Sequence, residues 1–202
     1  RKLTRRLIEK KTLRGVAISR LDLVDIVDSP IDAEFCRSLM ADLTKPGVAA
    51  DLLATMPDVI FHLAGVVSGE AEANFEKGMA VNLDGTRALF DALRLATGVP
   101  RVVFTSSIAV FGAPFPDPIP DDFHLTPLTS YGTEKMVAEA LLDDYSRRGF
   151  FDGVGIRLPT ISVRPGLANA AASGFFSGII REPLAGVQAK LPVSKNVRHS
   201  HG

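Results

Sequence analysis

The chain has 202 residues, of which 46% are hydrophobic and 23% are charged, so it can form one globular domain and part of a second. Its 23 basic and 23 acidic residues cancel, which argues against a dedicated nucleic-acid or membrane-surface binder, because such proteins need a basic excess. The single cysteine, Cys36, cannot form an internal disulfide, so we expect a cytoplasmic protein and not a disulfide-stapled secreted one. No apolar stretch approaches the roughly 18 residues of a membrane-spanning helix.

The first segment, residues 1–13, has the spacing of a short amphipathic helix, with Leu3 and Leu7 one turn apart. Basic residues dominate positions 1–20, where Glu9 is the only acidic residue. A transit peptide would explain this Arg-rich stretch. The motifs described below favour the other interpretation, in which the segment is the solvated face of a surface helix.

Apolar runs then alternate with helical patterns along the chain. Strand-like runs occupy residues 20–27, 59–63, 102–105 and 154–158, and helical spacing occupies 49–55, 75–97 and 130–148. Strands that are apolar on both faces and separated by helices indicate an α/β protein with a parallel sheet covered on both sides. The alternation stops after Gly166, so we expect a domain boundary near Pro165.

Small or polar residues recur where these strands end. They are Asp25 near the end of the first run, Leu63, Ala64 and Gly65 at the end of the second, Ser106 and Ser107 after the third, and Pro159 and Thr160 after the fourth. Because ligands of open parallel sheets bind beyond the carboxyl ends of the strands, these positions predict a dinucleotide crevice.

The most informative pattern is Tyr131-Gly-Thr-Glu-Lys135, in which the phenol and the ammonium group share one face of a helix. A neighbouring ammonium group is expected to lower the pKa of a phenol from about 10, so that the phenol can exchange a proton with a substrate hydroxyl. The pair alone could be an ordinary surface pair, but a hydroxyl at Ser107, which ends the preceding strand, could hold the same substrate oxygen. The other tyrosine, Tyr145, is expected to pack.

These motifs, in this order, resemble the extended short-chain dehydrogenase/reductase superfamily, in its NAD-dependent epimerase/dehydratase branch. The matching segments are LVD at 23–25, ADL at 41–43, FHLAG at 61–65, VNLDGT at 81–86, TSSIAVFG at 105–112, YGTEK at 131–135 and RLPTISVRPG at 157–166. More narrowly, the stretch from His62 to Thr86, together with RLPTISVRPG and the following SGFFSGIIREPLAG, resembles the D-erythronate dehydrogenases.

The resemblance implies a Rossmann-type doubly wound parallel sheet. It also implies a division into an NAD-binding domain at 1–165 and part of a substrate-binding domain at 166–202. Two departures from the family pattern stand out. The first strand and its Gly-rich turn are missing from the sequence, and the substrate-binding portion is short. Without that turn, the pyrophosphate lacks its usual helix N-terminus, so the 202 residues alone are expected to bind the cofactor poorly.

The resemblance also assigns the residues that would hold NAD. Asp25 would accept hydrogen bonds from the adenosine ribose and would repel a 2′-phosphate, which favours NAD over NADP. The other positions are Asp42 and Leu43 beside the adenine; Leu63, Ala64 and Gly65 against the cofactor backbone; Asn82; Tyr131 and Lys135; and Pro159, Thr160 and Ile161 at the nicotinamide. Asp25 and Asp42 could instead be turn residues, and Asn82 could be purely structural.

For the reaction itself, the resemblance implies that Ser107 binds the reacting oxygen, Tyr131 is the general base and Lys135 tunes it. A carboxylate substrate calls for a cation in the pocket, for which Arg181 is the candidate, with Arg164 and Arg198 as rivals. The substrate contacts would be Ser68, Ser106, Ser107, Tyr131 and Arg181, with Thr105 as a further neighbour. No metal is expected, because His199 and His201 have no evident third ligand. His62, inside an apolar strand, reads as a hydrogen-bonded core residue.

Three functions remain open at this point. The first is NAD-dependent oxidation of the C2 hydroxyl of a small sugar acid such as D-erythronate, the second is sugar-nucleotide epimerisation or dehydration, and the third is non-catalytic NAD sensing. We also expect a homodimer through helices 75–97 and 130–148, whose apolar residues include Leu89, Phe90, Met136 and Leu141.

Overall fold

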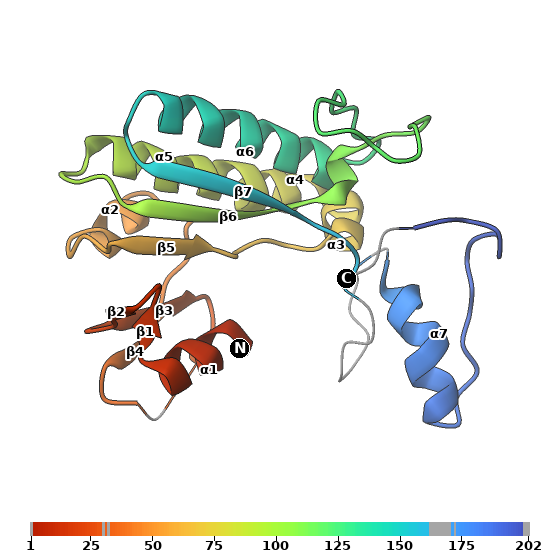
Figure 1. Cartoon of the computed structure of the whole chain (residues 1–202), viewed down its shortest axis with the longest axis horizontal. Coiled ribbons are helices and arrows are strands. Elements are labelled where there is room, and N and C mark those ends of the chain that lie inside the picture. The colour runs from red at the N-terminus through yellow and green to blue at the C-terminus, as the bar shows by residue number, and fades with distance from the viewer. Residues whose placement is uncertain (1, 30, 32, 162–170, 172, 200–202) are drawn as a thin grey trace. The chain divides into compact units, whose positions relative to one another are not determined.

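The computed structural model of the chain describes residues 2–29, 31, 33–161, 171 and 173–199. The chain forms two compact units, Arg1–Val48 and Ala49–Gly202, and each is described by itself (Figure 1). The expected boundary near Pro165 lies outside the described residues and remains a prediction.

The described residues of the first unit form one helix and four short strands. Helix α1 (Lys2–Lys10) is followed by an antiparallel hairpin of β1 (Thr12–Leu13) and β2 (Val16–Ala17). Arg14 and Gly15 turn that hairpin with positive φ angles of 51° and 83°, as a two-residue hairpin turn requires. Strand β3 (Leu21–Asp25) then pairs in parallel with β4 (Cys36–Met40). Strand β4 was not predicted, because the polar Arg37 and Ser38 interrupt its apolar pattern.

The second unit is built around a parallel sheet in the order β5-β6-β7, formed by Val59–His62, Arg101–Ser107 and Asp152–Leu158. Its helical elements are α2 (Val48–Leu52), α3 (Ser68–Ala73), α4 (Phe75–Gly78), the π-helical turn η1 (Met79–Asp84), α5 (Gly85–Leu95), the 3₁₀ turn η2 (Ile108–Val110), α6 (Ser130–Arg147) and α7 (Gly174–Leu184). The expected helix at 75–97 is therefore three elements, because a π-helical turn separates α4 from α5.

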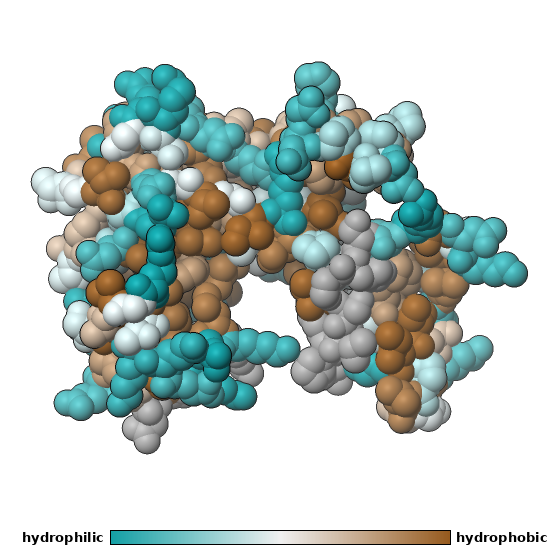
Figure 2. All heavy atoms as spheres, viewed as in Figure 1, coloured by the Kyte–Doolittle hydropathy of each residue, from teal (hydrophilic) through white to brown (hydrophobic). Residues whose placement is uncertain are grey.

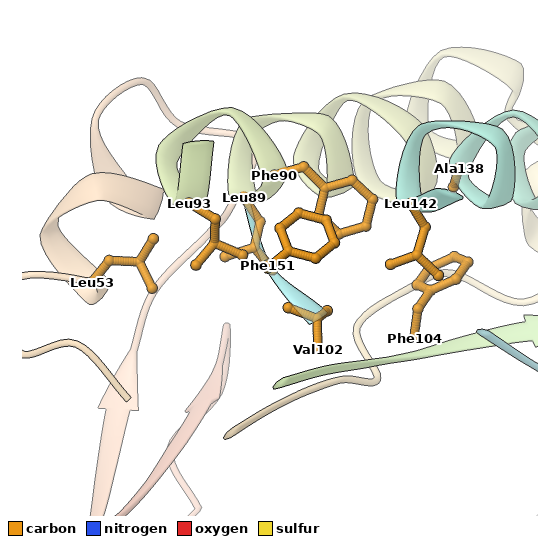
Figure 3. Close-up of a cluster of buried hydrophobic side chains, with 9 residues drawn as sticks. All are labelled: Leu53, Leu89, Phe90, Leu93, Val102, Phe104, Ala138, Leu142 and Phe151. Atoms are coloured by element: carbon orange, nitrogen blue, oxygen red, sulfur yellow. The ribbon is translucent and has the colours of Figure 1, made fainter. Parts of the chain in front are cut away.

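The core lies between the sheet and helices α5 and α6 (Figure 3). On β6, alternate residues such as Val102 and Phe104 are fully buried against these helices, as the two-residue period of a strand dictates. Phe90 of α5 packs at the centre, with its ring 5.1 Å from that of Phe151. Leu89 and Phe90 are 5% and 0% exposed. They serve the chain's own core, so the expectation that these two residues supply a dimer surface was wrong.

The two faces of β7 differ. Gly153 and Gly155 face α6, where they leave room for the side chain of Leu142. The alternate residues Val154, Ile156 and Leu158 are between 38% and 45% exposed. On β7, the face opposite α6 is therefore only partly covered by the described residues.

Apolar side chains also reach the surface elsewhere and are drawn in brown in Figure 2. No helix among the described residues is long and apolar enough to cross a membrane.

Candidate active site

The start of α6 places Tyr131 beside the end of β6. The Thr129 hydroxyl caps the helix by accepting a hydrogen bond from the Gly132 amide at 3.1 Å, which satisfies one of the free amides of the first turn. A Cβ on Gly132 would overlap the carbonyl oxygen of Ala109. Glycine therefore lets the first turn of α6 pack directly on the segment after β6. This contact fixes the position of Tyr131, the neighbour of Gly132.

Lys135 lies one turn further along α6 and is buried. Its Nζ donates to the Thr105 carbonyl at 3.0 Å, and Nζ lies 4.8 Å from the centroid of the Phe104 ring and 5.7 Å from that of Tyr131. Burial lowers the pKa of Lys135 to about 8, although the negative charge of Glu134 acts in the opposite direction. The lysine thus lies beside the phenol on the same face of α6, as the four-residue spacing predicted.

The expectation that the lysine lowers the pKa of the tyrosine was wrong for this structure. Burial raises the pKa of Tyr131, and a hydrogen bond with the Ser107 side chain offsets this only in part. The negative charge of Glu134 raises the pKa further. The physical reason is that the loss of solvent disfavours the phenolate, while the Lys135 ammonium group is engaged by the Thr105 carbonyl. The phenol is therefore protonated at neutral pH.

The two serines at the end of β6 point in different directions. The Ser107 hydroxyl caps η2 by accepting from the Ala109 amide at 3.2 Å, and it also interacts with Tyr131. Ser106 lies on the same face of β6 as Phe104 and is 3% exposed, and its Oγ has no hydrogen-bond partner among the described residues. A substrate contact by Ser106 stays a prediction.

Asn82 ties the end of β5 to the helices. Its Oδ1 accepts from the Val66 amide at 2.9 Å, and its Nδ2 donates to the Val66 carbonyl at 3.2 Å. A Cβ on Gly65 would come within 2.8 Å of Asn82 Oδ1 and 3.6 Å of Lys135 Nζ. Only a glycine fits between these groups, and Leu63, Ala64 and Gly65 are all exposed. A ligand can thus approach the backbone after β5 closely.

His62 is a hydrogen-bonded core residue, as expected. The Thr86 hydroxyl donates its single proton to the Asn82 carbonyl at 2.8 Å, so at 2.8 Å from His62 Nε2 it must act as the acceptor. This fixes the neutral ring with its proton on Nε2. The ring stacks on Phe104 with centroids 5.8 Å apart, and burial lowers the pKa of His62 to about 4.

The predicted adenosine contacts belong to the first unit. Asp25 ends β3 and is exposed, and its Oδ1 lies 3.4 Å from the Val27 amide. Asp42 accepts from both the amide and the hydroxyl of Thr44 at 2.9 and 2.7 Å, which lowers its pKa. These are the local turn contacts that the sequence left open as alternatives. Binding of adenosine by Asp25, Asp42 and the half-buried Leu43 stays a prediction.

The remaining candidates lie apart in sequence. Pro159, Thr160 and Ile161 follow β7, and the Thr160 hydroxyl is 2.6 Å from His199 Nε2. Ser68 begins α3, and Arg181 of α7 pairs with Glu182 at 2.5 Å. Arg198 pairs with Asp117, whereas Arg164 and His201 lie outside the described residues.

Two features of α6 were not predicted. Glu134, inside the Tyr-Lys motif, is 1% exposed, although its four-residue spacing with Ala138 and Leu142 signals that it faces the core. The Tyr145 hydroxyl donates to Asp91 at 2.7 Å, while its ring packs on Phe90, Phe150 and Phe151 as expected of a packing residue.

Among the described residues, no cluster of three or more His, Cys, Asp or Glu side chains could hold a metal ion.

Comparison with known families gives a match over almost the whole chain. The model of the NAD dependent epimerase/dehydratase family matches residues 1–195. The chain belongs to this family. The parallel sheets with helices are those of its Rossmann-like fold, and NAD is the cofactor that its description names.

Curated relatives narrow the comparison. A D-erythronate dehydrogenase from Cupriavidus necator is 52% identical over 197 residues, which cover 95% of this chain and 61% of the relative. A second D-erythronate dehydrogenase, from Haemophilus influenzae, is 42% identical over 91% of this chain and 59% of the relative. The chain thus spans about three-fifths of the length of these relatives.

Solved structures agree on the fold. A protein described as a nucleoside-diphosphate-sugar epimerase from Agrobacterium tumefaciens has a TM-score of 0.90 and 60% identity, covering 99% of this chain and 60% of that one. MoeE5, solved with UDP-glucose and NAD, has a TM-score of 0.70 and 26% identity over 92% of this chain and 57% of that one.

Proposed function

We propose that this chain carries the NAD-binding and acid–base part of a dehydrogenase that oxidises the C2 hydroxyl of a small sugar acid such as D-erythronate. The observation that carries the proposal is the juxtaposition of Tyr131, Lys135 and Ser107 at the end of β6. The 52% and 42% identical relatives, both D-erythronate dehydrogenases, indicate the substrate class.

Each of these residues is proposed to have its own role in the oxidation. Ser107 holds the substrate hydroxyl, and Tyr131 as phenolate accepts its proton. Lys135, whose Nζ lies 5.7 Å from the centroid of the Tyr131 ring, is proposed to hold the nicotinamide ribose beside the phenol. Because burial raises the pKa of Tyr131, its ionisation limits activity at neutral pH. Arg181, together with Ser68 and Ser106, is proposed for the substrate side.

The residues present fit the cofactor that the family description names. The backbone from Leu63 to Gly65 is exposed at the end of β5, and no side chain larger than that of glycine fits at position 65 beside Lys135 and Asn82. NAD, when bound, supplies the acceptor for the hydride. On the proposed assignment, Lys135 and Asn82 hold the nicotinamide end together with Pro159, Thr160 and Ile161. Asp25, Asp42 and Leu43 hold the adenosine end.

Sugar-nucleotide epimerisation is the second candidate. It is supported by the 60% identical structure from Agrobacterium tumefaciens, whose description names that activity. The same acid–base group would serve both reactions, so the two candidates differ in the substrate pocket. A non-catalytic NAD sensor is the weakest alternative, since it has no need of a buried Tyr-Lys pair.

One screen separates these candidates. The protein is incubated with NAD and either sugar acids or nucleotide sugars, and NADH fluorescence is followed. We expect NADH to accumulate with four-carbon sugar acids. Interconversion of nucleotide sugars without net NADH would establish the epimerase instead, and NAD binding with no turnover of either class would establish the sensor. We further propose a cytoplasmic homodimer that acts in carbohydrate metabolism.

A further inference from the structure

Glu134 stands between the two residues of the acid–base pair in sequence, and the reaction proposed above gives it no role. Its side chain is 1% exposed, a position that a carboxylate occupies only at a cost unless its oxygens find partners. One oxygen has such a partner, because Oε2 accepts a hydrogen bond from Asn82 Nδ2 at 2.6 Å. The other, Oε1, has no partner among the described residues.

The backbone makes room for this carboxylate. A Cβ on Gly78 of α4 would overlap Glu134 Oε1 and would come within 3.0 Å of the Ala71 side chain. A side chain at position 78 would displace the Glu134 carboxylate, so the glycine leaves this space to the carboxylate. The buried acid is therefore a built feature of the packing between α3, α4 and α6.

The bond to Glu134 decides which way the Asn82 amide points. An ionised carboxylate accepts hydrogen bonds and donates none, so it must face the NH₂ end of the amide. Asn82 Oδ1 is then left to accept from the Val66 amide at 2.9 Å, and the second Nδ2 proton reaches the Val66 carbonyl at 3.2 Å. With the amide turned over, its oxygen would face the carboxylate and both bonds to Val66 would be lost.

Resting on the proposed function, we propose that Glu134 is a positioning residue for the Tyr131–Lys135 pair. It locks the Asn82 amide, which holds the backbone after β5 against Lys135, and it sets one negative charge beside the phenol and the ammonium group. Asn82 and Lys135 meet at Gly65. A Cβ built on this glycine would lie 2.8 Å from Asn82 Oδ1 and 3.6 Å from Lys135 Nζ, so the backbone at Gly65 transmits the position of Asn82 to Lys135.

The effect of the Glu134 charge on Tyr131 can be measured without any catalysis. The chain contains two tyrosines and no tryptophan, so Tyr145→Phe leaves Tyr131 as the only phenol, and near-ultraviolet absorbance then follows its ionisation alone. Among the described residues, Glu134 of α6 acts on Tyr131 through its charge and Lys135 of α6 lies against the Tyr131 ring, while the Lys135 charge in turn lowers the pKa of His62 on β5. His62, with a pKa of about 4, stays neutral throughout the alkaline titration.

The decisive variant is Glu134→Gln in this one-tyrosine protein. Glutamine keeps an oxygen for the Asn82 amide but removes the charge, so the phenol should ionise at lower pH than in the parent. Glu139→Gln is the matched control. Glu139 is another buried acid of α6, but it is paired with Arg157 at 2.8 Å and is not among the groups that shift the pKa of Tyr131. Removal of its charge should therefore leave the pH of Tyr131 ionisation unchanged. An unmoved or upward-shifted titration in Glu134→Gln overturns the charge role.

The orienting role is tested by Glu134→Leu, which has no acceptor for Asn82. We expect turnover to fall by about 10²-fold, the loss typical of a displaced reactive group, while Glu134→Gln retains most of the parent's turnover at high pH. Equal losses in both variants would overturn the positioning role. Failure of the proposed function is a separate outcome, because the phenol titration is measured whether or not any sugar acid is oxidised.

Discussion

His62 shows how a single buried residue makes the stability of the fold depend on pH. Its folded pKa of about 4 lies below the ordinary value of about 6.5. The neutral ring therefore stabilises the fold above pH 6.5, and this contribution is lost as the pH falls toward 4, because only the unfolded chain binds the proton. The full loss is on the order of 3 kcal/mol, since each pKa unit corresponds to about 1.4 kcal/mol.

His62→Phe should remove this dependence, because phenylalanine keeps the stacking on Phe104 and cannot bind a proton. Urea unfolding at pH 7 and at pH 4.5 is the measurement. We expect the parent protein to lose more unfolding free energy between these two pH values than the variant does. An equal loss in both proteins would show that other groups govern acid stability.

At the same scale, Asp25 governs the choice between NAD and NADP on the proposed assignment. Its carboxylate is exposed at the end of β3 and would repel a 2′-phosphate. We expect kcat/KM to favour NAD strongly, and Asp25→Ser to narrow that preference. Asp28→Ser, at a nearby exposed acid, should leave it unchanged. A parent enzyme that uses both cofactors equally would remove Asp25 from the ribose.

At the scale of elements, the start of α6 depends on the lack of a side chain at Gly132, whose Cβ would overlap the Ala109 carbonyl. Gly132→Ala should therefore lower the free energy of unfolding by about 1–3 kcal/mol, as other overpacked sites do, and should displace Tyr131. Gly155→Ala is the matched control, because its Cβ would make an ordinary contact at 3.5 Å with Leu142. Thermal unfolding compares the two, and equal destabilisation would contradict this account.

The elements also show what the sequence can predict. The apolar runs at 59–63 and 154–158 coincide with β5 and β7 to within two residues, because most residues of these two strands are apolar or glycine. Strand β4 escaped detection because Arg37 and Ser38 break its pattern. The π-helical turn that carries Asn82 was not predicted, because the apolar spacing of a helix continues through it.

The same contrast holds at the site. Tyr131, Lys135 and Ser107 were identified because their spacing is fixed by one helix turn and one strand end. The prediction that the pKa of Tyr131 is lowered was wrong, because burial and the nearby Glu134 charge, which raise it, depend on the tertiary structure. Whether Asp42 forms a turn or binds a ligand was equally open, since its Thr44 contacts are visible only in the folded chain.

At the scale of the whole molecule, the proposed homodimer must use the outer residues of α5 and α6, because Leu89 and Phe90 are buried in the core. Ala140 is exposed on α6. Ala140→Arg should shift sedimentation at micromolar concentration from dimer to monomer, whereas Ala50→Arg, at an exposed alanine of α2, should not. A parent protein that sediments as a monomer at this concentration would contradict the proposed dimer.

The central claim is that Tyr131 is the general base, and Tyr131→Phe tests it most directly, because phenylalanine keeps the ring packing and deletes only the ionisable group. The parent's turnover should rise with pH, since burial raises the pKa of the phenol and only the phenolate accepts the proton. In the variant, turnover should fall by about 10²–10⁴-fold, the usual contribution of general acid–base catalysis, with NAD affinity little changed and the rise with pH abolished. A Tyr131→Phe enzyme that keeps most of the parent's turnover, with the same rise with pH, would contradict the account.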